Sequence, residues 1–319
     1  MIDETLFNRV YCCVFENMFE LIPDESIQLL FTSPPYEDMV NYRDGKGEVI
    51  AGKIVGQEFI NLYWTGLFKE AQRCMKKDGT IVINTNDKVY KGVVRSTNIR
   101  GILAVEEMGW YMIENIKWFK TNGSQRGPHR LQDWYEHIYC FSRDPENVKI
   151  YPDRVRGEYS ETSKQRYGYV YKQPSLFGGE INVGGDSVAE IGEAANRVMS
   201  KEGSKRKPKE KTVALNEDGK LMPNVIMVSP DKRKGSSHTA RFPFDLPRLG
   251  IVLFTDKGDV VCDPFCGSGT TLSVAKEMER HYIGCDISDE YVKEAEILIS
   301  KTDVQIQLVP TEDSIKLEV

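Results

Sequence analysis

The sequence predicts an α/β fold built on a mostly parallel sheet with helices on both faces. Two observations carry this prediction. Strand-like and helix-like apolar patterns alternate along residues 25–142, and the same alternation returns from residue 244 to residue 301. The length of 319 residues suits one large domain with a smaller inserted one.

Each element is expected from its own pattern. Glu25 to Phe31 has the composition of a short buried strand, and it ends at Thr32-Ser33-Pro34-Pro35-Tyr36 because two prolines cannot continue a strand ladder. The other expected elements are a helix over 57–75 closed by Lys77-Asp78-Gly79, a strand over 80–84, a helix over 99–108, strands over 111–119 and 137–142, a helix over 244–254, a strand over 260–263, a helix over 269–278, a strand over 282–286 and a helix over 289–301.

The regular pattern stops between residues 151 and 221. This stretch contains Gly178-Gly179, Gly184-Gly185 and the basic run from Lys201 to Lys211, so we expect it to be rich in loops. We therefore divide the chain into residues 1–150, an insertion over 151–221, and residues 222–319.

The charge is unevenly distributed. The whole chain has a formal net charge of −6. Residues 117–245 hold 23 of the 42 basic residues and 17 of the 48 acidic ones, a net charge of +6, whereas the rest of the chain carries −12. A solvated charged surface would show a similar surplus, but the middle of the chain is the part best suited to a polyanion.

Composition indicates an ordinary globular protein, with 40% hydrophobic and 28% charged residues. No apolar run reaches the roughly 20 residues of a membrane span, and the acidic start of the chain lacks the basic beginning of a signal peptide. The seven cysteines and four histidines show no metal-ligand spacing. We expect a cytoplasmic protein with reduced thiols and no metal site.

A glycine-rich turn is expected to bind a nucleoside cofactor. The segment from Asp263 to Thr271 reads Asp-Pro-Phe-Cys-Gly-Ser-Gly-Thr-Thr and lies between a strand and a helix. Its glycines allow a tight turn and a close approach to a ligand, and the helix N-terminus offers backbone N–H groups. About 20 residues further on, a strand ends in Asp286, which can accept hydrogen bonds from ribose hydroxyls. The segment has neither the dinucleotide fingerprint nor the Gly-Lys-Ser/Thr of a phosphate-binding loop.

This turn resembles the cofactor motif of amino-methylating DNA methyltransferases. His238-Thr239-Ala240-Arg241-Phe242-Pro243 is similar to a second motif of that family, with Thr239 in place of the usual proline. The resemblance implies a Rossmann-like S-adenosylmethionine-dependent methyltransferase fold. It implies cofactor contacts from Thr32, His238, Ala240, Phe242, Asp263, Phe265, Gly267, Gly269, Thr270 and Asp286.

Thr32-Ser33-Pro34-Pro35-Tyr36 resembles the catalytic loop of the same family. An exocyclic amine of a base is conjugated with its ring and is a poor nucleophile, so it needs acceptors for its two N–H groups. The Ser33 side chain and the Pro34 carbonyl can be those acceptors, Pro35 helps to keep the loop rigid, and Tyr36 can stack on a flipped base. No cysteine nucleophile of the kind used for carbon-5 methylation is implied.

The order of these motifs predicts a circular permutation. The catalytic loop precedes the cofactor turn, as in the β-group of the family, which puts the target-recognition region between them. Trp118-Phe119-Lys120, Trp134-Tyr135-Glu136-His137 and Asn224-Val225-Ile226 resemble further family segments. We therefore expect DNA contacts from Lys205, Arg206, Lys207 and Lys209, and duplex DNA as the partner. The resemblance also allows a cognate restriction endonuclease as a partner.

The Ser-Pro-Pro-Tyr form favours a site-specific enzyme that methylates N4 of cytosine by base flipping, since enzymes acting on N6 of adenine more often have Asp-Pro-Pro-Tyr. Three alternatives remain at this point: adenine N6 methylation, methylation of RNA or of a protein amide, for which Asn-Pro-Pro-Tyr is commoner, and a DNA-binding protein on an inactive methyltransferase scaffold. One departure from the family is the stretch Cys12-Cys13-Val14-Phe15, where an acid usually contacts the cofactor's adenine.

Overall fold

The computed structural model describes residues 5–36, 42–43, 49–51, 54–124, 131–157, 172–174, 180–182, 220–230 and 241–303. The chain divides into two compact units, residues 1–155 with 223–319, and residues 156–222. In the smaller unit, β10 (Lys172–Pro174) pairs antiparallel with β11 (Glu180–Asn182), and Gly157 forms a bridge with Lys220.

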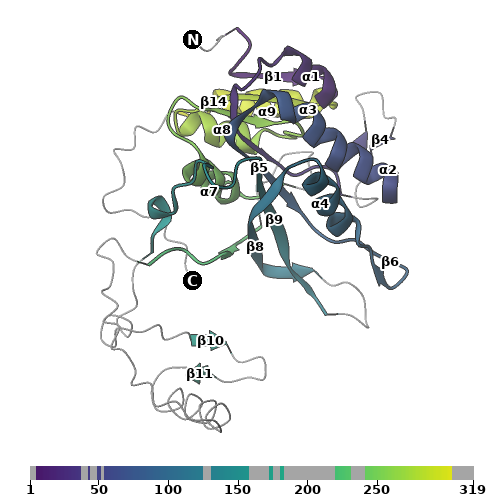
Figure 1. Ribbon diagram of the computed structural model, residues 1–319, viewed down its shortest axis with the longest axis vertical. Coiled ribbons are helices and arrows are strands. Elements are labelled where there is room, and N and C mark those ends of the chain that lie inside the picture. Colours follow the sequence, from purple (N-terminus) through teal and green to yellow (C-terminus); the bar gives the residue numbers. More distant parts are fainter. Residues whose placement is uncertain are drawn as a thin grey trace. The chain divides into compact units, whose positions relative to one another are not determined.

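An eight-stranded sheet forms the centre of the larger unit (Figure 1). In spatial order its strands are β1 (Arg9–Cys12), β14 (His281–Asp286), β13 (Val260–Asp263), β2 (Ile27–Thr32), β5 (Met75–Thr85), β9 (Asp133–Ser142), β8 (Tyr111–Ser124) and β12 (Val225–Val228). Strand β9 runs antiparallel to both of its neighbours, and every other pairing in this sheet is parallel. The predicted α/β fold with a mostly parallel sheet is confirmed.

The strand order also shows the permutation. Strands β13 and β14 come from the last third of the chain, yet they lie between β1 and β2 from its beginning. Strand β2 pairs with β13 on one side and with β5 on the other. The C-terminal end of β2, which leads into the predicted catalytic loop, and the C-terminal end of β13, which leads into the glycine-rich turn, are therefore neighbours at one edge of the sheet.

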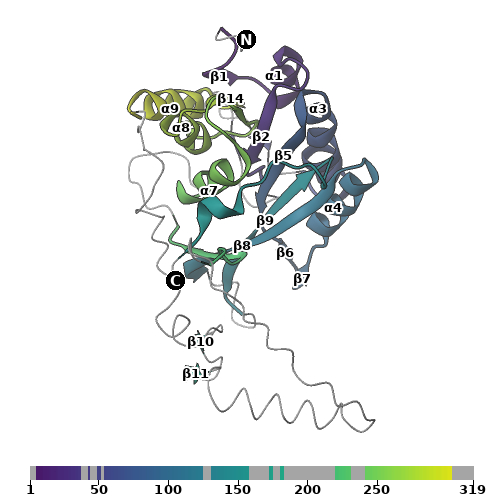
Figure 2. The ribbon, with the colours of Figure 1, turned by 60° about the vertical axis from the view of Figure 1, so that its left-hand side comes forward.

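Helices cover both faces of the sheet, as Figure 2 shows, with α7, α8 and α9 on one side and α1, α3 and α4 on the other. Their bounds are α1 Phe15–Leu21, α2 Gly56–Ile60, the π-helix η1 Asn61–Gly66, α3 Leu67–Cys74, α4 Thr97–Glu107, the 3₁₀-helix η2 Pro152–Val155, α7 Asp245–Phe254, α8 Thr270–Glu277 and α9 Asp289–Ser300. Two short hairpins complete the unit, β3 (Tyr42–Arg43) with β4 (Val49–Ala51) and β6 (Val89–Tyr90) with β7 (Val93–Val94).

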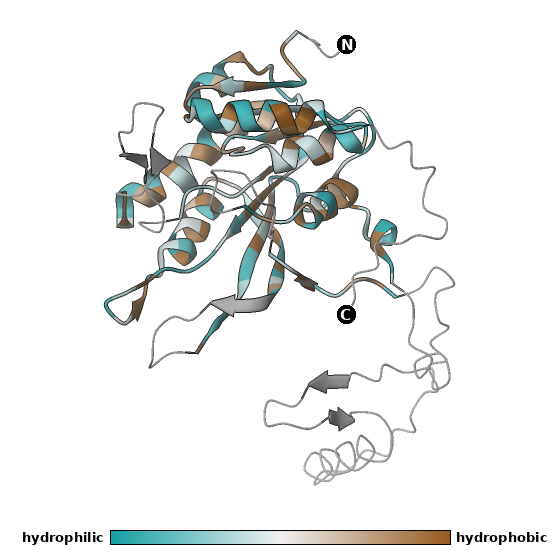
Figure 3. Ribbon diagram, turned by 180° about the vertical axis from the view of Figure 1, so that it is seen from behind, coloured by the Kyte–Doolittle hydropathy of each residue, from teal (hydrophilic) through white to brown (hydrophobic). Residues whose placement is uncertain are grey.

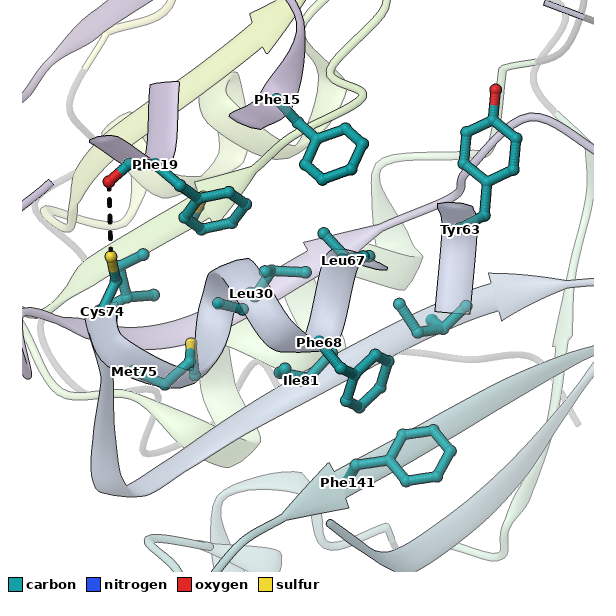
Figure 4. Packing of buried hydrophobic residues seen from close by; sticks show 14 of the residues in the cluster. Phe15, Phe19, Leu30, Tyr63, Leu67, Phe68, Cys74, Met75, Ile81 and Phe141 are labelled. Atoms are coloured by element: carbon teal, nitrogen blue, oxygen red, sulfur yellow. Dashed lines mark hydrogen bonds between the residues drawn. The ribbon is translucent and has the colours of Figure 1, made fainter. Parts of the chain in front are cut away.

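The main hydrophobic core lies between the sheet and the α1–α3 face (Figure 4). Phe68 of α3 is fully buried and packs edge-on against two rings, Phe141 at 5.2 Å and Trp110 at 5.4 Å between centroids. Each such buried side chain contributes about 1.5–3 kcal/mol through removal from water. Figure 3 shows the hydrophobic residues of the helices as stripes along the ribbon, as expected for helices packed on a sheet.

The structure corrects one boundary. Lys77-Asp78-Gly79 does not close the preceding helix, because α3 ends at Cys74 and these residues belong to β5. Met75 is already paired with Ile27 of β2 and is completely buried. Pairing with a neighbouring strand therefore extends β5 through residues whose local pattern is typical of a helix end.

Across the described residues, no helix combines the length and the apolar character needed to cross a membrane.

Candidate active site

The predicted catalytic loop follows the last residue of β2. Thr32 is fully buried, and its hydroxyl donates a 2.6 Å hydrogen bond to Asp263 Oδ1 at the end of β13. Backbone N–H of Phe265 donates to the same oxygen at 3.2 Å. Burial raises the pKa of the Asp263 carboxyl to about 6, against the opposing effect of these hydrogen bonds. Asp263 therefore connects the start of the catalytic loop to the start of the glycine-rich turn.

Within the loop, the side chains form a directed chain of hydrogen bonds. The Ser33 hydroxyl lies 3.4 Å from the Tyr36 hydroxyl, to which it donates. The Tyr36 hydroxyl in turn donates to Glu136 Oε2 of β9 at 2.7 Å. Because the hydrogen of Ser33 is used in this way, the lone pairs of its oxygen can accept a hydrogen from another group.

Glu136 is itself held by two further residues. It is only 8% exposed, its Oε1 forms a 2.6 Å ion pair with Lys120 of β8, and its Oε2 accepts a 3.2 Å hydrogen bond from the Asn84 amide of β5. A buried carboxylate needs such partners to offset its lost hydration. Three neighbouring strands thus fix the group that holds Tyr36.

The glycine-rich turn joins β13 to α8. Gly267 and Gly269 have φ angles of 49° and 82°, a region that favours glycine. A Cβ at Gly269 would lie 2.7 Å from the Cβ of Ala295 in α9, so the turn also needs glycine for space. The N-cap of α8 is Gly269, which has no side chain with which to cap the helix. The buried Ser268 hydroxyl has no hydrogen-bond partner within the described parts of the chain.

Asp286, the last residue of β14, faces this turn. Its Oδ2 accepts from the Gly267 backbone N–H at 3.0 Å, and its Oδ1 accepts from the Ser288 backbone N–H at 2.9 Å. Burial raises the pKa of Asp286 above its ordinary value, although these backbone hydrogen bonds lower it. A carboxylate has about four acceptor sites, so Asp286 can also accept a hydrogen bond from a ligand hydroxyl.

An aromatic cluster borders the turn. The Phe265 ring packs edge-on against Phe15 of α1 at 5.3 Å and against Tyr63 of η1 at 5.5 Å. Phe242, also predicted to lie near the cofactor, packs against Phe31 of β2 at 5.7 Å. The π-helical turn in the helix predicted over 57–75 is thus the element that brings Tyr63 to the cofactor turn.

Most of the residues selected from the sequence come together at this edge of the sheet. Direct hydrogen bonds join Thr32 and Phe265 to Asp263, and Gly267 to Asp286. The predicted site residues that lie outside the described parts of the chain are His238, Ala240, Lys205, Arg206, Lys207 and Lys209.

Sequence reasoning missed Glu136, Asn84 and Lys120 as members of the site. Glu136 and Lys120 belong to segments that resemble the family, but neither residue stands out there as a functional group. For Glu136, the available signal was a carboxylate between the rings of Tyr135 and His137 in a strand, because an acid in a buried strand needs a partner.

The stretch that lacks the usual acid is the end of β1. Cys12 pairs with Asp286, and the Cys13 backbone N–H donates to the Asp286 carbonyl at 3.1 Å. This segment therefore lies beside the ribose-binding candidate, with thiols and backbone groups in place of a carboxylate.

Fold and site together define an α/β methyltransferase whose catalytic loop and glycine-rich turn meet at the carboxyl ends of parallel strands. The model of a DNA methylase family, covering N6 and N4 methyltransferases, matches residues 27–297. The chain belongs to this family of amino-methylating DNA methyltransferases. Enzymes of the family depend on S-adenosylmethionine, as predicted from the cofactor turn.

Individual relatives agree with this assignment. The chain is 28% identical over 287 residues to the orphan methyltransferase M.BamHII of Bacillus amyloliquefaciens, covering 86% of this chain and 89% of that one. It is 25% identical over 296 residues to the type II methyltransferase M.PvuII of Proteus hauseri, covering 86% and 78%.

Solved structures show the same fold. The cytosine-N4-specific PvuII DNA methyltransferase is similar with a TM-score of 0.62 at 21% identity, over 94% of this chain and 92% of that one. A DNA modification methylase from Thermus thermophilus, solved with S-adenosyl-L-methionine, has a TM-score of 0.54 at 18% identity, over 92% and 94%.

Proposed function

We propose that this protein methylates N4 of cytosine in duplex DNA at a specific site. The observation that carries the proposal is the Ser33–Tyr36 loop, hydrogen-bonded through Thr32 to the cofactor turn. Its serine form is the one expected for cytosine enzymes, and a relative of the same fold is cytosine-N4-specific. When bound, S-adenosylmethionine supplies an electrophilic methyl group on a sulfonium.

The residues around the turn fit that cofactor. Asp286 has acceptor capacity left for ribose hydroxyls. The unpartnered buried hydroxyl of Ser268 and the uncapped start of α8 offer polar groups to a ligand that approaches the glycine turn. The Phe265 ring, with Tyr63 beside it, provides an apolar wall.

The catalytic loop acts by orienting the amine. Ser33 Oγ and the Pro34 carbonyl accept the two amine hydrogens, which raises electron density on the nitrogen. The chain from Ser33 through Tyr36 to the Glu136 carboxylate strengthens Ser33 as an acceptor, because hydrogen bonds in series polarise one another. The Tyr36 ring, fixed at its hydroxyl, offers its face for stacking on a base that has left the duplex.

Residues 151–221 are proposed as the target-recognition region, and the basic run with Lys205, Arg206, Lys207 and Lys209 as its DNA-contacting part. The support is the net charge of +6 in residues 117–245 of an otherwise acidic chain. The position of this region between the catalytic and cofactor motifs agrees with the permuted strand order.

The decisive experiment identifies the methylated base. The protein is expressed in a methylation-deficient host, and nucleosides from the host DNA are analysed by mass spectrometry, with Tyr36→Ala expressed in parallel as the control. We expect N4-methylcytosine with the natural chain, and clearly less of it with Tyr36→Ala. Finding N6-methyladenine would replace the base but keep the mechanism; 5-methylcytosine would overturn the mechanism.

A further inference from the structure

The hairpin formed by β6 and β7 begins where β5 ends, at the same edge of the sheet as the catalytic loop. Strand β2 pairs with β5 so that Thr32, immediately before the loop, is opposite Ile83. Two residues after Ile83, β5 ends at Thr85, and the hairpin follows. In Figure 1 and Figure 2 it projects from this edge beyond the sheet.

The tip of the hairpin is a tight two-residue turn. Lys91 and Gly92 both have positive φ angles, 47° and 80°, as a type I′ hairpin turn requires. A lysine at such a position is unusual, since the left-handed region is unfavourable for residues with a Cβ. The turn places the exposed Lys91 ammonium at the outermost point of the hairpin.

The hairpin and the first two turns of the helix after it contain basic residues and no acidic residue; Glu106 and Glu107 appear only at the C-terminal end of that helix. The segment from Lys88 to Val105 contains four basic residues, Lys88, Lys91, Arg95 and Arg100, and no acidic residue, in a chain with a net charge of −6. Lys91 Nζ lies 5.4 Å from the centre of the Tyr90 ring, and the Arg95 guanidinium lies 4.7 Å from it. The ring therefore holds two cations side by side on the hairpin.

The base of the hairpin is anchored. Asn86 donates to Asp133 at 2.7 Å, and Asn98 of α4 donates to Asp87 at 3.0 Å. Backbone N–H of Arg95 donates to the Lys88 carbonyl at 2.8 Å, which closes the hairpin. Asp87 and Asp133 are thus engaged by amides at the base of the hairpin.

The outer surface of the hairpin is exposed although it carries large apolar residues. Tyr90 and Val93 are 44% and 66% exposed. Figure 3 shows hydrophobic and hydrophilic residues next to each other along this hairpin. Cations mixed with an aromatic ring suit a nucleic acid, where charge meets phosphate and flat or apolar groups meet sugars and bases.

We propose that the β6–β7 hairpin binds the phosphate backbone of duplex DNA beside the base to be methylated. The proposal rests on the proposed function, which requires a duplex to lie across this edge of the sheet. Lys91 and Arg95 neutralise phosphates, and Tyr90 holds the two cations in place. This contact does not depend on the DNA sequence, and it is separate from any contact made by the basic run in residues 201–211.

The test measures the salt dependence of binding to a duplex of arbitrary sequence, with full-length protein and fluorescence anisotropy. Each phosphate that the protein no longer neutralises lowers the slope of log K against log salt concentration by about 0.9. Lys91→Gln/Arg95→Gln should therefore reduce the slope by about one to two. The matched control, Lys69→Gln/Lys77→Gln, removes two exposed charges, one of them at the opposite end of β5, and should leave the slope unchanged.

Three readouts separate the outcomes. An unchanged slope for the hairpin variant overturns the proposal, even where the natural chain methylates DNA. A reduced slope that is accompanied by a lower molar mass in light scattering also overturns it, because the hairpin would then be a contact between copies of the chain. A reduced slope with unchanged mass and unchanged S-adenosylmethionine affinity supports it, whichever base proves to be methylated.

Discussion

At the residue scale, Tyr36 depends on a partner 100 positions away in the sequence. Its hydroxyl donates to Glu136, which is paired with Lys120 and Asn84. The motif around Ser33 and Tyr36 is local, so the sequence could identify it. Glu136 could not be identified in this way, because only the pairing of β5 with β9 brings it to the loop.

This hydrogen-bond chain makes Tyr36 and Glu136 energetically coupled. Tyr36→Phe keeps the ring but loses the hydrogen bond, which should cost about 0.5–1.5 kcal/mol in kcat/KM. Tyr36→Ala also loses stacking, about 1–3 kcal/mol per base. Glu136→Gln should lower activity as well, and the double variant Tyr36→Phe/Glu136→Gln should be less impaired than the sum of its parts.

Steady-state methylation assays and calorimetry with S-adenosylmethionine measure these effects. Cofactor affinity should be nearly unchanged in all four variants, since none of the altered groups contacts the turn. Fully additive losses in the double variant would mean that the two residues act separately.

Asp286 is the residue on which cofactor affinity should depend most. Asp286→Asn keeps the size of the side chain but loses its charge and one acceptor, so S-adenosylmethionine should bind about 1–3 kcal/mol more weakly, roughly 5- to 150-fold. The control is Asp289→Asn, an exposed acid three residues further on. Equal affinities of the two variants for S-adenosylmethionine in calorimetry would show that Asp286 does not bind the cofactor.

At the element scale, the sequence predicted the elements around the cofactor turn more closely than the strands elsewhere in the sheet. Strand β13 and helices α7 to α9 agree with their predicted ranges to within one or two residues, because their apolar patterns are regular. The short strands β1, β6 and β7 were not predicted. Unlike β13, whose four residues are all buried, these strands of two to four residues have no continuous buried apolar run. Their pairing partners lie elsewhere in the chain or across a tight turn.

The turn before α8 allows a matched comparison between two glycines. Gly269 and Gly258 share a φ of 82°, but a Cβ at Gly258 meets nothing within 4 Å, whereas at Gly269 it meets Ala295. Gly258→Ala should cost about 1–2 kcal/mol from the left-handed backbone alone. Gly269→Ala should cost a further 1–3 kcal/mol, roughly the usual cost of overpacking.

Urea unfolding of the two variants gives the difference directly. We also expect Gly269→Ala to weaken S-adenosylmethionine binding, because α8 must move away from α9 to accommodate the methyl group. Equal losses of stability in the two variants would show that the backbone angle, and not the close approach of α9, explains the glycine at position 269.

At the scale of the whole molecule, the order of two motifs was enough to predict that the fold is circularly permuted. A catalytic loop that precedes its cofactor turn requires late strands to enter between early ones, and β13 and β14 do so. The sequence could not predict the register of these strands or the antiparallel direction of β9. Register and strand direction depend on how all eight strands pack together, so a local sequence pattern does not predict them.

The distribution of charge is also a property of the whole chain, with a net charge of +6 in residues 117–245 and −12 in the rest. Replacing Lys205, Arg206, Lys207 and Lys209 by glutamine should weaken duplex binding and lower its salt slope by about 0.9 for every phosphate that is no longer neutralised. Cofactor affinity should not change. The control replaces four exposed lysines of the larger unit, Lys69, Lys77, Lys257 and Lys301. The same slope in both variants would place the DNA contacts of the insertion elsewhere.

Combining this variant with the hairpin variant Lys91→Gln/Arg95→Gln tests whether both elements bind one duplex. The salt slope reports how many phosphates are neutralised, so two elements that bind the same DNA molecule at the same time should reduce the slope additively. If only one of them is engaged in a given complex, the combined reduction will be no larger than the greater single reduction. Anisotropy titrations of all three variants between about 50 and 200 mM salt, the range over which such contacts change affinity most visibly, distinguish these outcomes.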